Sequence, residues 1–168
     1  LSKGDEVILP SFTIISCAQA LTKLGVKPVL VDSEYDTFNI KIKDIESKIT
    51  SKTKAIMIVH IYGLTVDVDP ILDLAKKYNL KIIEDSADTL GARINGKSSG
   101  QYSDVSITSF YGSHIINGAG NGGMLCLNSK RMYKEAILSR SWGRSSSIFK
   151  ENSESIKNRF NVKIDGIE

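Results

Sequence analysis

Residues 55–60 read AIMIVH, a continuous apolar run that ends in His60. An unbroken run of this length is typical of a β-strand covered on both faces, as in parallel sheets. A second strand is expected at residues 81–85, which read KIIED. Between them the sequence predicts a helix over residues 69–78, with Asp69 as its cap and Pro70 in its first turn. A strand, a helix and a second strand in this order predict a parallel β-α-β unit.

Similar segments extend in both directions from this unit. The other strands are expected at residues 6–10, 28–32, 105–110 and 124–127, and the other helices at residues 11–24, 42–49 and 130–140. Short apolar strands that alternate with helices are typical of the α/β class. We therefore expect a mostly parallel sheet with helices on both faces.

The composition excludes several classes of protein. Of the 168 residues, 41% are hydrophobic and 24% are charged, which is ordinary for a globular domain. The net charge of +3 comes without a run of basic residues, so we expect no nucleic-acid partner. No apolar stretch is long enough to span a membrane, and no signal peptide is recognisable. Two cysteines cannot form a disulfide framework, so we expect a cytoplasmic protein.

The two ends of the sequence suggest a piece of a longer chain. The sequence opens on Leu1 rather than Met and closes on IDGIE without a recognisable helix end. We therefore interpret residues 1–168 as the central portion of a larger domain, although a small domain with ragged ends is an alternative. Residues 145–158 are polar and rich in serine, and we expect a mobile loop there.

Three groups of polar residues follow predicted strands, and ligands of open α/β sheets bind at the carboxyl ends of strands. These groups are His60, the pair Glu84-Asp85, and residues 109–114. Each could also be an ordinary strand or helix cap, and for His60 we favour a structural role.

Other kinds of site are poorly supported. Residues 118–123 match G-x-G-x-x-G by letter, but a strand follows them instead of a helix, so we reject a dinucleotide site. The two histidines and two cysteines lack the spacing of metal ligands, so we expect no metal site. No G-x-S-x-G nucleophile elbow is present.

Six motifs, taken in order, are more specific than any single one. They are GDEVILPSFT at 4–13, PVLVD at 28–32, TKAI at 53–56, VHIYG at 59–63, EDSA at 84–87 and SFY at 109–111. In this order they resemble the vitamin-B6-dependent nucleotide-sugar aminotransferases of the DegT/StrS type. The resemblance implies the large domain of a fold-type I transferase that binds pyridoxal phosphate (PLP), with a seven-stranded sheet. It also implies a homodimer whose further cofactor and cross-dimer residues lie outside this stretch.

The resemblance carries over to individual site residues. Asp85 matches the carboxylate that keeps the cofactor's pyridine nitrogen protonated. Ser109 matches the serine that contacts the cofactor phosphate. Asp88 stands where aminotransferases usually have Gln or His near the cofactor's 3-hydroxyl. Ile14 stands near the position of a ring-stacking aromatic residue in many members.

His114 departs from the aminotransferase pattern and decides the expected function. Aminotransferases end the motif S-F-Y-x-x-K with the lysine that binds the cofactor covalently, whereas here the motif ends in His114. Imidazole cannot replace that amine, but it can act as a base near neutral pH. A histidine at this position, together with WGR at 142–144, resembles the branch of GDP-4-keto-6-deoxy-D-mannose 3-dehydratase. That branch uses pyridoxamine phosphate (PMP), held without a covalent bond, and removes the C3 hydroxyl of a nucleotide-linked sugar.

Within that branch, the CDP-type enzymes carry an iron–sulfur cluster on cysteines after the WGR motif. Here that place reads SSS at 145–147, so we expect no cluster, and we expect glutamate as the amino donor. Two alternatives remain open. One is a PLP-dependent aminotransferase similar to perosamine synthetase, and the other is a non-catalytic member of the fold.

Overall fold

A computed structural model describes residues 1–142 of the chain. Residues 1–126 form one compact unit, and residues from 127 onward belong to a second one. The loop expected at 145–158 and the serine run at 145–147 lie outside the described residues. Within residues 1–142, no helix is both long and apolar enough to cross a membrane.

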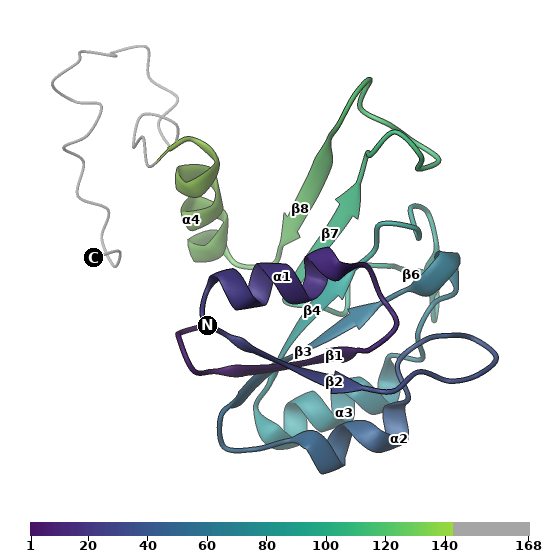
Figure 1. Ribbon diagram of the computed structural model, residues 1–168. Helices are drawn as coiled ribbons and strands as arrows, with labels where there is room; N and C mark the ends of the chain where they lie inside the picture. Colours follow the sequence, from purple (N-terminus) through teal and green to yellow (C-terminus); the bar gives the residue numbers. More distant parts are fainter. Residues whose placement is uncertain (143–168) are drawn as a thin grey trace, which may run out of the picture. The chain divides into compact units, whose positions relative to one another are not determined.

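The first unit is built around a mixed β-sheet, in which most neighbouring strands are parallel. Its strands, in spatial order, are β2 (Lys27–Val31), β1 (Glu6–Pro10), β3 (Thr53–Val59), β4 (Lys81–Asp85), β7 (Val105–Ser109) and β8 (Gly123–Leu127). The pairs from β2 through to β7 are all parallel. Figure 1 shows β8 running in the opposite direction to β7. The expected mostly parallel sheet is confirmed, and six of its strands lie among the described residues.

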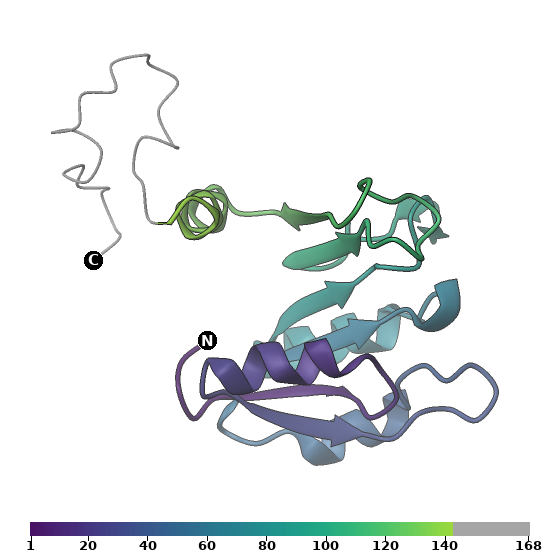
Figure 2. The same ribbon diagram turned by 45° about the horizontal axis from the view of Figure 1, so that its top comes forward.

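Helices cover both faces of the sheet, as expected. Figures 1 and 2 show α1 (Ile15–Lys23) on one face and α2 (Ile42–Ile45) and α3 (Asp69–Tyr78) on the other. Because side chains alternate along a strand, each face has its own core. Val7 and Met57 pack on the side of α1, and Ile8 and Ile56 pack in the core that contains Ile71 of α3. In the second unit, α4 (Lys130–Arg140) begins after Ser129, whose hydroxyl accepts a hydrogen bond from the N–H of Met132.

Several boundaries differ from the sequence-based expectation, among them strand ends that shift by one or two residues. Helix α1 begins at Ile15 instead of Ser11, because Ile14 is still extended, with a ψ of 138°. Asp69 is the first residue of α3 rather than its cap, and the cap position belongs to Val68. The helix expected over 42–49 is an α-helical turn followed by the 3₁₀ turn η1 (Glu46–Lys48). His60 lies just beyond β3 rather than within it.

Two short strands were not expected. β5 (Arg93–Ile94) and β6 (Lys97–Ser98) form an antiparallel hairpin. Asn95 and Gly96 join them with φ angles of +48° and +78°. An Asn-Gly pair in the left-handed region is typical of a tight hairpin turn, so the dipeptide was a signal that the sequence offered.

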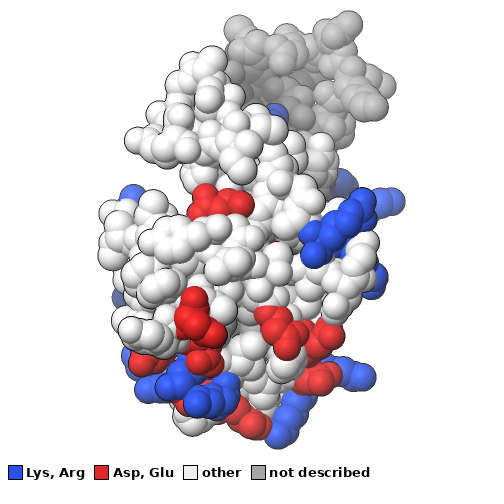
Figure 3. Space-filling view, turned by 90° about the vertical axis from the view of Figure 1, so that its right-hand side faces the viewer, with Lys and Arg blue, Asp and Glu red and all other residues white. Residues whose placement is uncertain are grey.

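The order of the strands determines where a ligand can bind. From β1 the chain passes to β2 on one side and later to β3 on the other. A reversal of this kind opens a crevice at the carboxyl ends of the strands. The 3₁₀ turn η2 (Ile61–Gly63) follows β3 at that edge. In Figure 3, which views the molecule from this side, lysine and arginine atoms gather away from the centre of the face.

Candidate active site

A pocket of about 540 Å³ lies at the edge predicted from the strand order. The segments that follow β1, β3, β4 and β7 all contribute to it. Its walls include three serines and a threonine, two aspartates, two histidines and two aromatic residues, among them Ser11, Phe12, Thr13, Ser16, His60, Tyr62, Asp85, Asp88, Ser109 and His114. Among residues 1–142, no lysine or arginine lines it. Its size is that of a site for a small molecule or cofactor.

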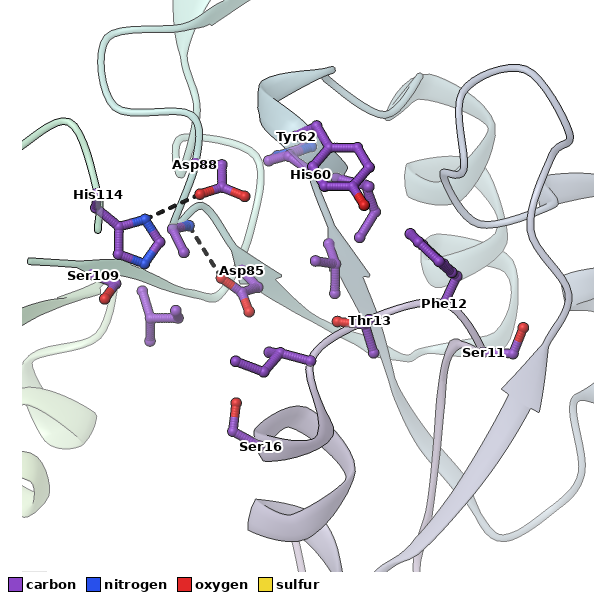
Figure 4. A pocket seen from close by; sticks show the side chains of 15 residues that line it. Ser11, Phe12, Thr13, Ser16, His60, Tyr62, Asp85, Asp88, Ser109 and His114 are labelled. Carbon is purple, nitrogen blue, oxygen red and sulfur yellow. Dashed lines mark hydrogen bonds and ion pairs between the residues drawn. The ribbon is translucent and has the colours of Figure 1, made fainter. Parts of the chain in front are cut away.

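All four site residues named from the sequence meet in this pocket. They are Asp85, Asp88, Ser109 and His114. In Figure 4, His114 and Ser109 lie on one side, and Phe12 and Tyr62 lie on the other. The four residues line one pocket, and their assignment to a functional site remains a prediction.

His114 and Asp88 form a pair on the wall of the pocket. Nδ1 of His114 lies 3.0 Å from Oδ1 of Asp88, and their side chains are 22% and 44% exposed. A carboxylate only accepts hydrogen bonds, so it favours a proton on Nδ1. The other ring nitrogen, Nε2, is then left with a free lone pair and can take up a proton. The pair has the arrangement of a general base and the group that orients it.

Asp85 stands at the end of β4 and is almost fully buried. The backbone N–H of Ala87 donates to its Oδ1 at 3.1 Å. The thiol of Cys17 donates to its Oδ2 at 3.3 Å. This second contact joins residues 68 positions apart, and the sequence offered no signal for it.

Ser109 is the last residue of β7. Its hydroxyl oxygen accepts a hydrogen bond from the N–H of Tyr111 at 3.2 Å. The hydroxyl proton remains available for an acceptor in the pocket. A carboxylate and a hydroxyl donor at one site are groups that suit a pyridine nitrogen and a phosphate, respectively.

His60 forms a second histidine–carboxylate pair, deeper in the fold. Its Nε2 lies 2.9 Å from Oε1 of Glu84, and Nδ1 accepts the N–H of Val66 at 3.1 Å. Ser86 and the N–H of Gly100 also donate to Oε1 of Glu84. Burial raises the pKa of Glu84, but hydrogen bonds from His60, Ser86 and Ser103 outweigh this effect and hold the pKa below its usual range. Both nitrogens of His60 are occupied, which supports the structural role expected from the sequence.

Aromatic side chains at the mouth of the pocket were not singled out from the sequence. The ring of Phe12 lies 5.2 Å from that of Phe38 and 6.2 Å from that of Tyr62, measured between centroids. Phe38 and Tyr62 both have positive φ angles, of +59° and +52°. This conformation is rare for bulky residues and is often found at functional sites. Ile14 also lines the pocket, where the resemblance placed a ring-stacking residue in other members.

Two of the known proteins with similar sequences are GDP-perosamine synthases. The chain is 44% identical over 137 residues to GDP-perosamine synthase of Escherichia coli O157:H7, covering 82% of the chain and 37% of that enzyme. It is 45% identical over 143 residues to GDP-perosamine synthase of Caulobacter vibrioides, and this match covers 85% of the chain and 38% of that enzyme. The chain thus spans well under half the length of these relatives.

Solved structures match over most of the chain. An aminotransferase from Psychrobacter cryohalolentis gives a TM-score of 0.84 at 32% identity, covering 90% of this chain and 38% of that one. A histidine-to-asparagine mutant of GDP-4-keto-6-deoxymannose-3-dehydratase with bound GDP-perosamine gives a TM-score of 0.87 at 25% identity. This match covers 95% of this chain and 42% of that one. The fold expected from the resemblance is confirmed. The named relatives above are perosamine synthases, so they support the family and favour the aminotransferase alternative over the dehydratase branch.

The model of the DegT/DnrJ/EryC1/StrS aminotransferase family matches residues 1–168. With this match over the whole sequence and the shared fold, the chain belongs to the DegT/DnrJ/EryC1/StrS aminotransferase family.

Proposed function

We propose that this chain is part of a PMP-dependent enzyme that removes the C3 hydroxyl of a nucleotide-linked 4-keto-6-deoxy hexose. The observation that carries the proposal is the side chain at position 114. An imidazole, oriented by Asp88, stands in the pocket, and none of the lysines in residues 1–142 lines that pocket. An enzyme that binds its cofactor through a lysine needs a primary amine within reach of it. A histidine in that place supports chemistry with a cofactor that is not covalently held.

The residues present fit such a cofactor. Asp85 would hold a proton on the pyridine nitrogen, because a buried carboxylate favours the protonated, charged ring beside it. Ser109 would donate its hydroxyl proton to the phosphate. When bound, the cofactor supplies an amine that condenses with the keto group of the sugar and a ring that takes up electrons.

His114 would act as the general base. With the Nδ1 proton facing Asp88, Nε2 accepts a proton from the reacting carbon, and Asp88 stabilises the positive charge that the ring acquires. The walls formed by Phe12 and Tyr62 would limit the access of water on the opposite side. We propose glutamate as the donor that regenerates the amine, a homodimer as the assembly and a cytoplasmic location.

An aminotransferase is the second candidate. It is favoured by the identity of 44–45% to two GDP-perosamine synthases. This candidate requires a lysine at the reacting centre, and the sequence has none between Lys97 and Lys130. The side chain at 114 therefore supports the dehydratase more strongly than the names of the relatives support the aminotransferase.

Product analysis of the full-length protein separates the candidates. The protein is supplied with PMP, glutamate and GDP-, CDP- or dTDP-linked 4-keto-6-deoxy hexoses, and the products are identified by mass spectrometry. Loss of the C3 hydroxyl supports the dehydratase. Replacement of the keto oxygen by an amine contradicts it and supports the aminotransferase. Absence of PMP binding and of turnover with every sugar contradicts both and indicates a non-catalytic member.

The absence of an iron–sulfur centre is a related expectation. The 168 residues contain Cys17 and Cys126 only, and a cluster needs several thiolates. Iron and acid-labile sulfide are assayed in full-length protein purified without oxygen. We expect no stoichiometric iron, and its presence would instead support an enzyme of the CDP type, which carries a cluster.

A further inference from the structure

We propose that Cys17 is a positioning residue whose thiol orients the Asp85 carboxylate toward the cofactor. Neither the sequence motifs nor the relatives' names point to this residue. The inference rests on the proposed function, because it assumes that Asp85 faces the pyridine nitrogen of a vitamin-B6 cofactor.

A short chain of hydrogen bonds connects helix α1 with the end of β4. The hydroxyl of Thr13, a wall residue of the pocket, donates to Sγ of Cys17 at 3.6 Å. The Cys17 thiol then donates to Oδ2 of Asp85 at 3.3 Å. Cys17 belongs to the apolar core between α1 and the sheet, so its position is fixed by packing. Asp85 is thereby tied to a helix on one face as well as to its own strand.

The chemistry of the contact determines which atom donates. An ionised carboxylate accepts hydrogen bonds only, so the proton of the contact belongs to sulfur. Burial raises the pKa of the Cys17 thiol to about 11, and the negative charge of Asp85 contributes in the same direction. The thiol therefore stays protonated at neutral pH and remains a donor.

The contact matters because the Asp85 carboxylate is almost fully buried. In the part of the chain that the structure describes, no lysine or arginine lines the pocket to compensate its charge. Two hydrogen bonds compensate the charge instead. The N–H of Ala87 donates to Oδ1, and the thiol of Cys17 donates to Oδ2. Hydrogen bonds to the charged form favour that form and also fix its orientation. These two contacts set the plane of the carboxylate before a cofactor binds.

The first part of the test needs no cofactor. The alkylation rate of Cys17 by iodoacetamide is followed by peptide mass spectrometry in the full-length protein, for the unmodified chain and for Asp85→Asn. Removal of the carboxylate charge lowers the pKa of the thiol, so the rate at pH 8 should rise by roughly threefold or more. An unchanged rate would show that the thiol and the carboxylate are not coupled and would overturn the inference.

The second part measures the dissociation constant of PMP. We expect Cys17→Ala to raise it by about 3- to 10-fold, since a thiol is a weak donor to a charged group. Cys17→Ser should restore it to within about twofold, because a hydroxyl donates in the same way. Cys126→Ala, which changes the exposed cysteine, is the matched control and should leave it unchanged.

The outcomes separate this inference from the proposed function. Equal affinity in Cys17→Ala and the unmodified protein would overturn the positioning role alone. An equal loss of PMP affinity in Cys17→Ala and Cys17→Ser would indicate that Cys17 acts through packing rather than hydrogen bonding. This result would also overturn the positioning role. If the unmodified protein fails to bind PMP, the proposed function fails and the role toward the cofactor fails with it, whereas the alkylation result still reports on the coupling.

Discussion

The chain has two histidines, and each lies against a carboxylate, yet the two pairs differ in almost every other respect. His60 and Glu84 are 0% and 1% exposed, whereas His114 and Asp88 are 22% and 44% exposed. The distances between the paired atoms are nearly equal, at 2.9 Å and 3.0 Å. Proximity of the two groups therefore does not distinguish a structural pair from a catalytic one.

The second ring nitrogen makes the difference. In His60, Nδ1 accepts the N–H of Val66, so both nitrogens are used inside the protein. In His114, Nδ1 is the one ring nitrogen that a residue of the described range 1–142 engages, through Asp88, and the ring borders the pocket. A histidine can move a proton to or from a ligand only through a nitrogen that the protein leaves free. The comparison predicts stability effects at the first pair and activity effects at the second.

Replacement of His114 should have the largest effect. In the full-length protein, His114→Asn should lower turnover by roughly 10²–10⁴-fold, which is the usual contribution of a general base. PMP affinity and melting temperature should change little, because the side chain is at the surface of the pocket. Steady-state kinetics and calorimetry measure the three quantities. Near-full activity in this variant would show that His114 is not the base.

The buried pair should respond in stability instead. Glu84→Gln removes the charge that accepts hydrogen bonds from His60, Ser86 and Gly100, and should lower the free energy of unfolding by about 2 kcal/mol. Urea denaturation of the full-length protein measures this loss. Asp88→Asn is the matched control, since it removes the carboxylate of the other pair, and its stability should stay within about 0.5 kcal/mol of the original. Equal losses in both variants would remove the contrast between the pairs.

Asp88→Asn should have a smaller effect on activity than the loss of the base itself. An amide keeps the size of the side chain but no longer stabilises a positively charged ring. Because Asp88 is 44% exposed and partly screened by solvent, we expect a loss in kcat of about tenfold. Unchanged PMP affinity would accompany that loss if Asp88 acts through His114. A loss confined to PMP affinity would instead support the direct contact with the cofactor that the resemblance implied for Asp88.

The pH dependence of stability offers the finest distinction. The pKa of Glu84 is held below its usual range, so its ionised form stabilises the folded state above the unfolded pKa of about 4.3, and that contribution is lost as pH falls through the folded pKa. The difference in unfolding free energy between the unmodified protein and Glu84→Gln should therefore shrink as pH falls below about 4.3. Urea titrations at several pH values test this. A difference that widens on acidification would contradict the assignment of an ionised Glu84.

Much of the fold could be predicted because its signals are local. The apolar runs at 55–60 and 81–85 identified the central strands, and their carboxyl ends identified the edge where His114, Asp85 and Ser109 meet. The start predicted for α1 at residue 11 was wrong, because the backbone is still extended at Ile14 and the helix begins at Ile15.

The hydrogen-bond partners could not be predicted in the same way. The contact between Cys17 and Asp85 joins two elements that meet only after the sheet has formed. The contact between His60 and Glu84 depends on the register of β3 against β4, which places Val59 opposite Asp85. Residue types can indicate which groups enter a site, but long-range packing determines which of them touch.

Covalent trapping tests the central claim most directly, namely that position 114 provides a base and no amine. The full-length protein and His114→Lys are each incubated with PLP, reduced with borohydride and examined by intact and peptide mass spectrometry. We predict no lysine-linked cofactor in the unmodified protein and a new modification at position 114 in His114→Lys, together with loss of dehydration. Stoichiometric labelling of another lysine in the unmodified protein would contradict the account and support the aminotransferase.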